Sequence, residues 1–286
     1  MPAIVNVDSG SAPAAREALG LSDAFDVHAV TPDAIESTLR ALAASGAKRV
    51  LVAGGDGTIA TAAAALLGTS TELAILPGGT LNHFARDFGI STVAAEALEL
   101  AGNPGTRAVD VGMLNGRVFL NTSSVGAYVR FVRTRERMER TLPYRLASVV
   151  AAVRLLTTVR RMGVEIEIDG RVRLFRTPLV FIGVGERELQ FPTLGRRVKD
   201  GRRGLHVMVI RGRSRARLVA IALTALFRGL EAVSRSGHFE TIIVDRFRIT
   251  LRGAGYVAVD GEIAVLDTPL EYSLRRDALT VVCPPP

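Results

Sequence analysis

The chain has 286 residues, of which 48% are hydrophobic and 22% charged, a composition typical of folded domains rather than disordered segments. Its one cysteine excludes an intramolecular disulfide and fits a reducing, cytoplasmic setting. The net charge of +8 is unevenly placed: residues 1–115 carry 6 Lys and Arg against 12 Asp and Glu, and residues 116–286 carry 30 against 16. This split favours two regions with different partners, the basic one attracting an anionic membrane surface or nucleic acid.

Two features bear on membranes and targeting. The first ten residues, MPAIVNVDSG, have neither a basic start nor a long apolar core, so we expect no signal peptide. The longest apolar stretches, at 58–67 and 216–227, are shorter than the roughly 20 residues that span a bilayer. We therefore expect a soluble protein that is at most peripheral to a membrane.

The first third of the chain alternates short apolar segments with segments of helical spacing. Strands are expected at 3–7, 25–30, 48–55 and 72–79, and helices at 11–20, 32–46, 59–68, 80–89 and 91–100. This alternation predicts a parallel sheet covered by helices on both faces, with ligands at the carboxyl ends of its strands. Three glycine-rich stretches, NVDSG, GGDGT and PGGT, fall at such strand ends.

From about residue 108 the pattern changes to period-two alternation around turn dipeptides. Hairpins are expected at Asn115-Gly116, Asp169-Gly170 and Asp260-Gly261, with helices at about 130–161 and 214–231. The predicted fold class is α/β plus β. An α/β nucleotide-binding domain over 1–112 precedes an antiparallel, sandwich-like β domain over 113–271.

The stretch GGDGT, residues 54–58, carries the clearest chemistry. Glycines allow the backbone to approach a ligand closely, and free N–H groups at a following helix N-terminus favour phosphate. An acidic side chain beside polyphosphate would repel it without a cation between them, so Asp56 indicates Mg²⁺. Thr58 could cap the helix or donate to phosphate. A glycine-rich turn with an exposed Asp56 is the alternative.

Two further stretches are less specific alone. In PGGT, Thr80 falls at a helix start and Asn82 in its first turn, so the stretch is either an ordinary capped helix or a second wall of a nucleotide site. In DGE, the hairpin turn by itself explains Asp260 and Gly261. Glu262 could accept the proton of an attacking hydroxyl if it faces a cleft. Zinc spacing, the P-loop motif and a serine-hydrolase elbow are all missing from the sequence.

Together these stretches resemble a known family. GGDGT, LPGGTLNHFARDFGI (76–90), FLNTSSVGAY (119–128) and VDGEIAVLDTPLEY (259–272) are similar, in this order, to the bacterial branch of the diacylglycerol kinase catalytic-domain family. Sphingosine and ceramide kinases are related to it. The resemblance implies an NAD kinase- or phosphofructokinase-like first domain, to which the last segment, 272–286, returns.

The resemblance also implies ATP- and Mg²⁺-dependent phosphorylation of a lipid hydroxyl, most directly that of diacylglycerol to give phosphatidic acid. Asp56 would organise Mg²⁺ and phosphate, and Glu262 would be the catalytic base. The nucleotide contacts it implies are Asn6, Ser9, Gly10, Thr31, Gly54, Gly55, Asp56, Gly57, Thr58, Gly79, Thr80 and Asn82.

Three departures from the family pattern stand out. Val7-Asp8 follows Asn6 where the family usually has proline, and His83 follows Asn82 where many members carry aspartate. A neutral imidazole cannot replace a carboxylate in a Mg²⁺ network. In VKDGRRGLHV (198–207), Asp200 is the only carboxylate where some members bind a structural metal, so the sequence leaves a second metal open.

The alternatives are a soluble-substrate kinase of the NAD kinase type and a non-catalytic nucleotide or lipid sensor on the same fold. Nucleic-acid binding rests on charge alone, because no recognition motif accompanies it. A cytoplasmic enzyme of phospholipid metabolism, peripheral at the inner membrane surface, is the expectation that we retain. The sequence leaves open which lipid is phosphorylated, how the protein is regulated and its oligomeric state, a homodimer included.

Overall fold

The chain divides into two compact units in a computed structural model. The first contains Met1–Val111 and Arg275–Pro286, and the second contains Gly112–Leu274. Strands β5 (Thr106–Leu114) and β18 (Leu270–Val282) each run from one unit into the other. The structure describes residues 1–139, 141–143, 147, 150–151, 154, 161–189, 194–210, 239–253 and 255–285.

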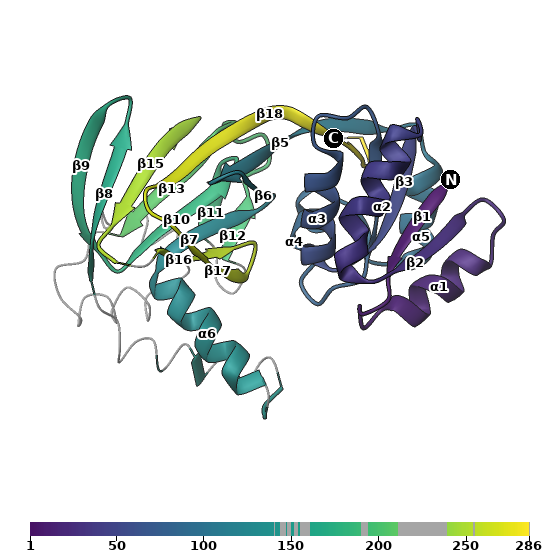
Figure 1. Cartoon of the computed structure of the whole chain (residues 1–286), viewed down its shortest axis with the longest axis horizontal. Helices are drawn as coiled ribbons and strands as arrows, with labels where there is room; N and C mark the ends of the chain where they lie inside the picture. Colours follow the sequence, from purple (N-terminus) through teal and green to yellow (C-terminus); the bar gives the residue numbers. More distant parts are fainter. Residues whose placement is uncertain are drawn as a thin grey trace. The chain divides into compact units, whose positions relative to one another are not determined.

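The first unit is built on a parallel sheet with strand order β2-β1-β3-β4-β18 (Figure 1). Its other strands are β1 (Pro2–Asn6), β2 (Asp26–Val30), β3 (Arg49–Gly54) and β4 (Glu72–Pro77). Its helices are α1 (Ala12–Gly20), α2 (Pro32–Ala44), α3 (Asp56–Leu66), α4 (His83–Asp87) and α5 (Ala94–Gly102). Pro32 opens α2, where the missing N–H costs no helical hydrogen bond.

Helices cover both faces of this parallel sheet, and α1 packs beside α5 and α2 beside α3. One core lies between the sheet and the first pair, with Leu19 of α1, Leu51 of β3 and Ala97 of α5 fully or almost fully buried. On the opposite face, Val52 of β3 and Ile35 of α2 are buried as well. Burial on both faces explains why these strands read as continuous apolar runs.

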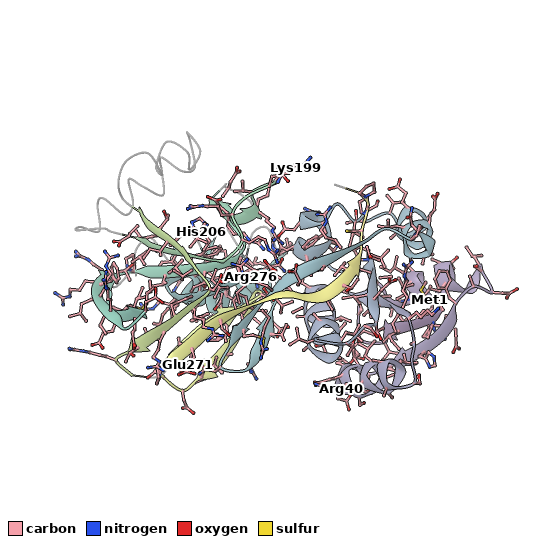
Figure 2. All side chains as sticks on the ribbon, turned by 90° about the horizontal axis from the view of Figure 1, so that it is seen from above. Met1, Arg40, Lys199, His206, Glu271 and Arg276 are labelled. Atoms are coloured by element: carbon pink, nitrogen blue, oxygen red, sulfur yellow. The ribbon has the colours of Figure 1, made fainter. Side chains whose placement is uncertain are left out.

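Among the described residues, the second unit contains two larger antiparallel sheets and a two-stranded one, β11-β12. The first has the order β14-β13-β10-β7-β16-β17, and the second continues from β18 through β15 and β8 to β9. Beyond β5 and β18, the elements are β6 (Arg117–Phe119), β7 (Thr122–Gly126), α6 (Ala127–Glu139), β8 (Met162–Ile168), β9 (Arg171–Thr177), β10 (Leu179–Val184), β11 (Arg187–Leu189), β12 (Leu194–Arg197), β13 (Leu205–Ile210), β14 (Phe239–Val244), β15 (Arg246–Leu251), β16 (Gly255–Val259) and β17 (Glu262–Leu266). Glu271 and Arg276, labelled in Figure 2, both lie on β18.

One apolar core joins side chains of both sheets, including Ile182 of β10, Ile166 of β8 and Tyr272 of β18. The rings of Phe247 and Tyr272 stack with centroids 4.6 Å apart, and the Tyr272 hydroxyl lies 3.0 Å from the Ser123 hydroxyl. The buried phenol therefore has a polar partner. The predicted fold class, α/β plus an antiparallel β part, is confirmed.

The three predicted hairpin turns form as expected. Asn115, Asp169 and Asp260 have φ values of 46°, 50° and 46°, and the glycine that follows each is also at positive φ. Two consecutive left-handed residues match the twist of a two-residue hairpin. The helix predicted at about 130–161 begins with α6, and most of its remainder lies outside the described residues, as does the helix predicted at 214–231.

Two sequence expectations need correction. The helix expected at 59–68 begins earlier, because α3 starts at Asp56 within GGDGT. The hydroxyl of Thr58 therefore does not cap α3, whose N-cap is Gly55. After the Asn115-Gly116 turn, the chain forms not one strand but two, β6 and then β7. In the part of the chain that the structure describes, no helix is long and apolar enough to cross a membrane.

His206 provides a pH-sensitive contact in the second unit (Figure 2). It lies on β13, is 6% exposed, and its Nδ1 accepts the N–H of Arg187 at 3.0 Å. Burial lowers the pKa of His206, with the Arg202 charge adding to the effect and Glu186 opposing it. The folded protein therefore favours the neutral ring.

Lowering the pH from 7.5 to 5.5 is expected to reduce the free energy of unfolding. The unfolded chain gains a proton at His206 below about pH 6.5, whereas the folded chain does so only at lower pH. His206→Asn keeps an acceptor near the position of Nδ1 but cannot titrate, so its unfolding free energy should fall less over this interval. Denaturant unfolding at both pH values measures this, and equal falls for the two proteins would contradict it.

Candidate functional site

Three strands of the parallel sheet end side by side. Asn6 ends β1, Gly54 ends β3 and Pro77 ends β4. The strands are parallel neighbours, so their carboxyl ends lie at one edge of the sheet. The N–H of Gly78 donates to the carbonyl oxygen of Gly54 at 2.8 Å, which continues the β3–β4 pairing into the loops.

The loops after β3 and β4 pack backbone against backbone. A Cβ added at Gly79 would lie 2.8 Å from Cα of Gly55, and one added at Gly78 would overlap the Ser11 hydroxyl. Neither Gly78 nor Gly79 has a positive φ. These glycines are therefore required by the close approach of the chain and not by backbone conformation. Ser11 also lies 2.9 Å from the Ser9 hydroxyl, which brings the loop after β1 to the same place.

Asn6 and Thr58 connect the first strand to α3. The Nδ2 of Asn6 donates to Oγ1 of Thr58 at 2.9 Å, and Oδ1 of Asn6 accepts the N–H of Asp8 at 3.0 Å. Thr58 is buried against Gly54, where a Cβ would meet its side chain at 2.6 Å. Because Oγ1 of Thr58 is the acceptor in this bond, its hydroxyl hydrogen is available to donate elsewhere.

Asp56 is the first residue of α3 and is half-buried. Its Oδ1 accepts the N–H of Phe84 at 3.4 Å, a long hydrogen bond that links it to the start of α4. Gly55 has no side chain to cap the helix, so the first N–H groups of this 11-residue helix have no side-chain partner. Helix N-termini of this kind can hold an anion, and here a carboxylate lies at the edge of that position.

Asn82 shapes the loop after β4. It has a left-handed backbone with φ of 49° and is buried. Its Oδ1 accepts the N–H of Gly79 at 2.8 Å, and its Nδ2 donates to the carbonyl oxygen of Gly79 at 2.7 Å. The amide therefore holds the turn that brings Gly79 against Gly55. The helix expected at 80–89 begins only at His83, so Thr80 does not start it and is exposed.

The remaining predicted nucleotide contacts are less closely integrated. Thr31 follows β2 directly and is the exposed N-cap residue of α2. A hydrogen bond from its hydroxyl lowers the pKa of Asp33. No hydrogen bond within the described residues joins Thr31 to the loops after β3 and β4. Gly10 and Gly57 are exposed, and nothing lies within 4 Å of a Cβ added at Gly10. These assignments stay predictions.

Asp56 is the residue of this unit for which the sequence predicts a metal ion. No group of three or more His, Cys, Asp or Glu side chains placed to hold a metal occurs among the described residues. Mg²⁺ usually keeps several waters and binds one or two carboxylates together with substrate phosphates. Asp56 at the N-terminus of α3 fits that donor set, whereas His83, half-buried next to Asn82, adds no carboxylate.

In the second unit, Glu262 is the first residue of β17 and is exposed. It has no hydrogen-bond or ion-pair partner within the part of the chain that the structure describes. The FLNTSS stretch beside it contains two buried polar atoms without a partner there, Oδ1 of Asn121 and Oγ of Ser124. The sequence analysis missed both, because orphaned atoms have no sequence signal.

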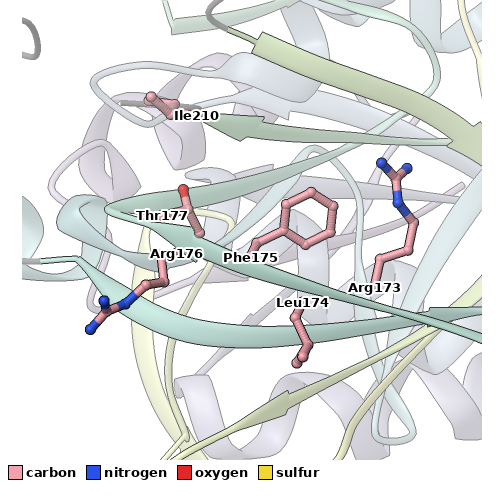
Figure 3. Close-up of a pocket in the computed structure, with 6 residues that line it drawn as sticks. All are labelled: Arg173, Leu174, Phe175, Arg176, Thr177 and Ile210. Carbon is pink, nitrogen blue, oxygen red and sulfur yellow. The ribbon is translucent and has the colours of Figure 1, made fainter. Parts of the chain in front are cut away.

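A separate hollow lies beside β9 (Figure 3). Residues 173–177 and Ile210 line it, and Arg173 and Phe175 point to the opposite side of the strand from Leu174 and Arg176. No acidic side chain belongs to this lining among the described residues. The hollow therefore offers no general base, and we do not include it in the candidate site.

Part of the chain matches a known protein family. Residues 3–114 match the family model "Diacylglycerol kinase catalytic domain", which covers all the glycine-rich loops described above. Residues 3–114 are therefore similar to the catalytic domain of the diacylglycerol kinase family. The resemblance drawn from the sequence motifs is therefore confirmed.

Curated relatives align with parts of this chain. The diacylglycerol kinase of Bacillus subtilis (strain 168) is 32% identical over 126 residues, which are 43% of this chain and 42% of that protein. A Pseudomonas syringae pv. syringae protein named "Probable lipid kinase YegS-like" is 43% identical over 85 residues, 29% of this chain and 28% of the relative. The chain thus aligns with less than half the length of these relatives.

Solved structures share the fold over nearly the whole chain. A crystal structure of a diacylglycerol kinase from Bacillus anthracis str. Sterne has a TM-score of 0.70 and 23% identity, covering 99% of this chain and 96% of that one. Another from the same organism has a TM-score of 0.75 and 24% identity, covering 99% and 95%. At this identity the likeness establishes the common fold.

Gly79→Ala is expected to destabilise the first unit. Its Cβ would lie 2.8 Å from the backbone Cα of Gly55 and 3.0 Å from Oδ1 of Asn82, so the two loops must separate, at a cost of about 1–3 kcal/mol. Gly102→Ala, where nothing lies within 4 Å of the new Cβ, is the matched control and should leave stability nearly unchanged. Thermal or denaturant unfolding measures both. Equal stability of the two variants would show that the loops are not closely packed.

Proposed function

We propose that the protein is an ATP- and Mg²⁺-dependent lipid kinase that phosphorylates a lipid hydroxyl, with diacylglycerol as substrate and phosphatidic acid as product. The observation that carries the proposal is the convergence of three glycine-rich strand ends on the N-terminus of α3, within the segment that matches the kinase family. The closely packed backbone at Gly55 and Gly79, the N–H groups of α3 without a side-chain cap and the Thr58 hydroxyl together suit the phosphates of ATP.

Each residue has a separate role in this proposal. The N–H groups at the start of α3 and the Thr58 hydroxyl would bind phosphate oxygens, and Asn6 would orient Thr58. Asp56 would hold Mg²⁺, which when bound offsets the negative charge of the phosphates. Asn82 would keep the loop after β4 in place. These groups position and bind the nucleotide and leave the acid–base step to another residue.

Glu262 is the residue proposed for that step. The lipid hydroxyl oxygen attacks the γ-phosphorus, the bond between that phosphorus and the bridging oxygen breaks to release ADP, and Glu262 takes the hydroxyl proton. An exposed carboxylate with no partner among the described residues can accept a proton without first losing a hydrogen bond. The family names of the relatives favour a lipid substrate over the soluble substrate of an NAD kinase-type enzyme.

The proposal is tested by transfer of labelled γ-phosphate from ATP to lipids in mixed micelles. The panel is diacylglycerol, monoacylglycerol, a sphingoid base and phosphatidylglycerol. We expect labelled phosphatidic acid that disappears without Mg²⁺, with Asp56→Ala, and falls by about 10²–10⁴-fold with Glu262→Gln, the usual loss for a general base. Folded protein that binds ATP but labels no lipid would instead support the sensor alternative.

Helix α6 is the part of the basic second unit that we propose to face the membrane. Arg130, Arg133 and Arg137 are exposed and spaced three and four residues apart, so they lie along one face of the helix. The buried face carries Val129 and Val132 and packs against the sheet that contains β7, β16 and β17. A row of arginines complements an anionic lipid surface.

An aromatic and apolar pair lies next to this row. Tyr256 is 43% exposed, Val265 opposite it on β17 is 61% exposed, and the Arg133 guanidinium lies 5.3 Å from the centre of the Tyr256 ring. Apolar groups beside cationic ones are typical of surfaces that enter the lipid headgroup region. The helix also carries Glu136 and Glu139, whose side chains lie outside the described residues.

Binding to vesicles tests this surface. Each arginine near an anionic bilayer contributes about 1 kcal/mol, so replacing Arg133 and Arg137 by Gln should weaken binding to phosphatidylglycerol vesicles roughly 30-fold. Arg40→Gln, on an exposed face of the acidic first unit, is the control and should not change it. Co-sedimentation at increasing salt measures the effect. Equal binding to anionic and zwitterionic vesicles would contradict the proposal.

A further inference from the structure

The Asp260-Gly261 turn between β16 and β17 contains a carboxylate that the turn itself does not require. A two-residue hairpin turn of this kind needs positive φ at both positions, which asparagine or glycine supplies equally well. Asp169-Gly170 forms the same turn between β8 and β9, and there the aspartate is exposed and has no hydrogen-bond partner within the described residues. The two turns therefore differ in how the carboxylate is used.

The carboxylate of Asp260 binds three consecutive backbone N–H groups. Its Oδ2 accepts from Leu120 at 2.7 Å, and its Oδ1 accepts from Asn121 at 2.8 Å and Thr122 at 2.9 Å. Its own N–H donates to the carbonyl oxygen of Thr122 at 2.8 Å. Four hydrogen bonds thus attach the turn to the residues that lead into β7. Three donors and no acceptor among the described residues match the ionised form of the side chain.

The surroundings of this half-buried carboxylate act on its charge in both directions. Burial raises the pKa of Asp260, although the three amides and the Arg187 guanidinium act in the opposite direction. The geometry shows the attachment itself, because all three amides reach this one side chain.

The position of Glu262 depends on this attachment. Glu262 is the second residue after Asp260 and pairs with Val259 across the turn. Its strand, β17, is the edge of the sheet and pairs with β16 alone in the described part of the chain. β16 in turn pairs with β7 through residues 257–259 only. The bonds from Asp260 to 120–122 extend this attachment to the turn from which Glu262 projects.

We infer that Asp260 is a positioning residue that holds Glu262 in place by binding the N–H groups of Leu120, Asn121 and Thr122. This inference rests on the proposed role of Glu262 as the base. Asp260→Asn removes one of the two carboxylate oxygens and places an NH₂ group where an acceptor is needed. The β16–β17 turn then loses at least one of its bonds, and the base loses its fixed position while its own side chain is unchanged.

A double-mutant cycle tests the inference. Asp260→Asn should lower kcat for lipid phosphorylation at least 10-fold with little change in KM for ATP. In a Glu262→Gln background the same substitution should have no further effect, because the group it positions is already gone. Asp169→Asn, at the equivalent turn without the three amides, is the matched control and should stay within twofold of the parent.

Other outcomes separate the possible failures. Equal losses from Asp260→Asn in the parent and in the Glu262→Gln background, or no loss in the parent, would overturn the positioning role while leaving the kinase proposal intact. A parent that labels no lipid would overturn the proposed function and, with it, this inference. If Asp260→Asn fails to fold, Asp260→Glu keeps the charge on an arm one methylene longer. It should lower kcat and shift its pH profile, and an unchanged kcat and profile would overturn the inference.

Discussion

The approach of the loop after β4 to the loop after β3 is the constraint on which the candidate nucleotide site depends. Gly55 and Gly79 lie so close that neither tolerates a Cβ without movement of backbone. Asn82 holds this arrangement through two hydrogen bonds to Gly79, and the long bond from Phe84 to Asp56 adds a further connection. The N-terminus of α3 is therefore presented within a compact wall of backbone, which is the surface that phosphate requires.

One amide and one carboxylate have a similar role in the two units: each organises a loop by binding backbone groups. Asn82 closes a turn in the first unit, and Asp260 binds three N–H groups in the second. Backbone amides are fixed by the fold, so a carboxylate or amide that binds them is fixed too. Asp56 and Glu262, the residues proposed for chemistry, have few side-chain hydrogen bonds among the described residues.

Helix α6 carries part of the positive charge of the second region of the sequence. Arg130, Arg133 and Arg137 are exposed on one side of this helix, and apolar residues anchor its other side to the sheet. A kinase that acts on a lipid must reach a hydroxyl at a bilayer surface, and a basic helix with an adjacent exposed Tyr256 and Val265 is suited to that surface. Substrate access and catalysis would then depend on different elements of the same unit.

The fold class, the three hairpin turns and the resemblance to the kinase family could be predicted from the sequence alone. Apolar periodicity and Asn-Gly or Asp-Gly dipeptides act over a few residues, and GGDGT with its companion motifs is specific without any contact information. Only the tertiary structure decided that Asp56 begins α3, that Asn82 is used within its own loop, and that Asp260 binds the amides of 120–122. In sequence, Asp169 and Asp260 are the same turn residue. They differ because only one of them has another strand's N–H groups within reach, and such long-range neighbours are set by packing and not by local spacing.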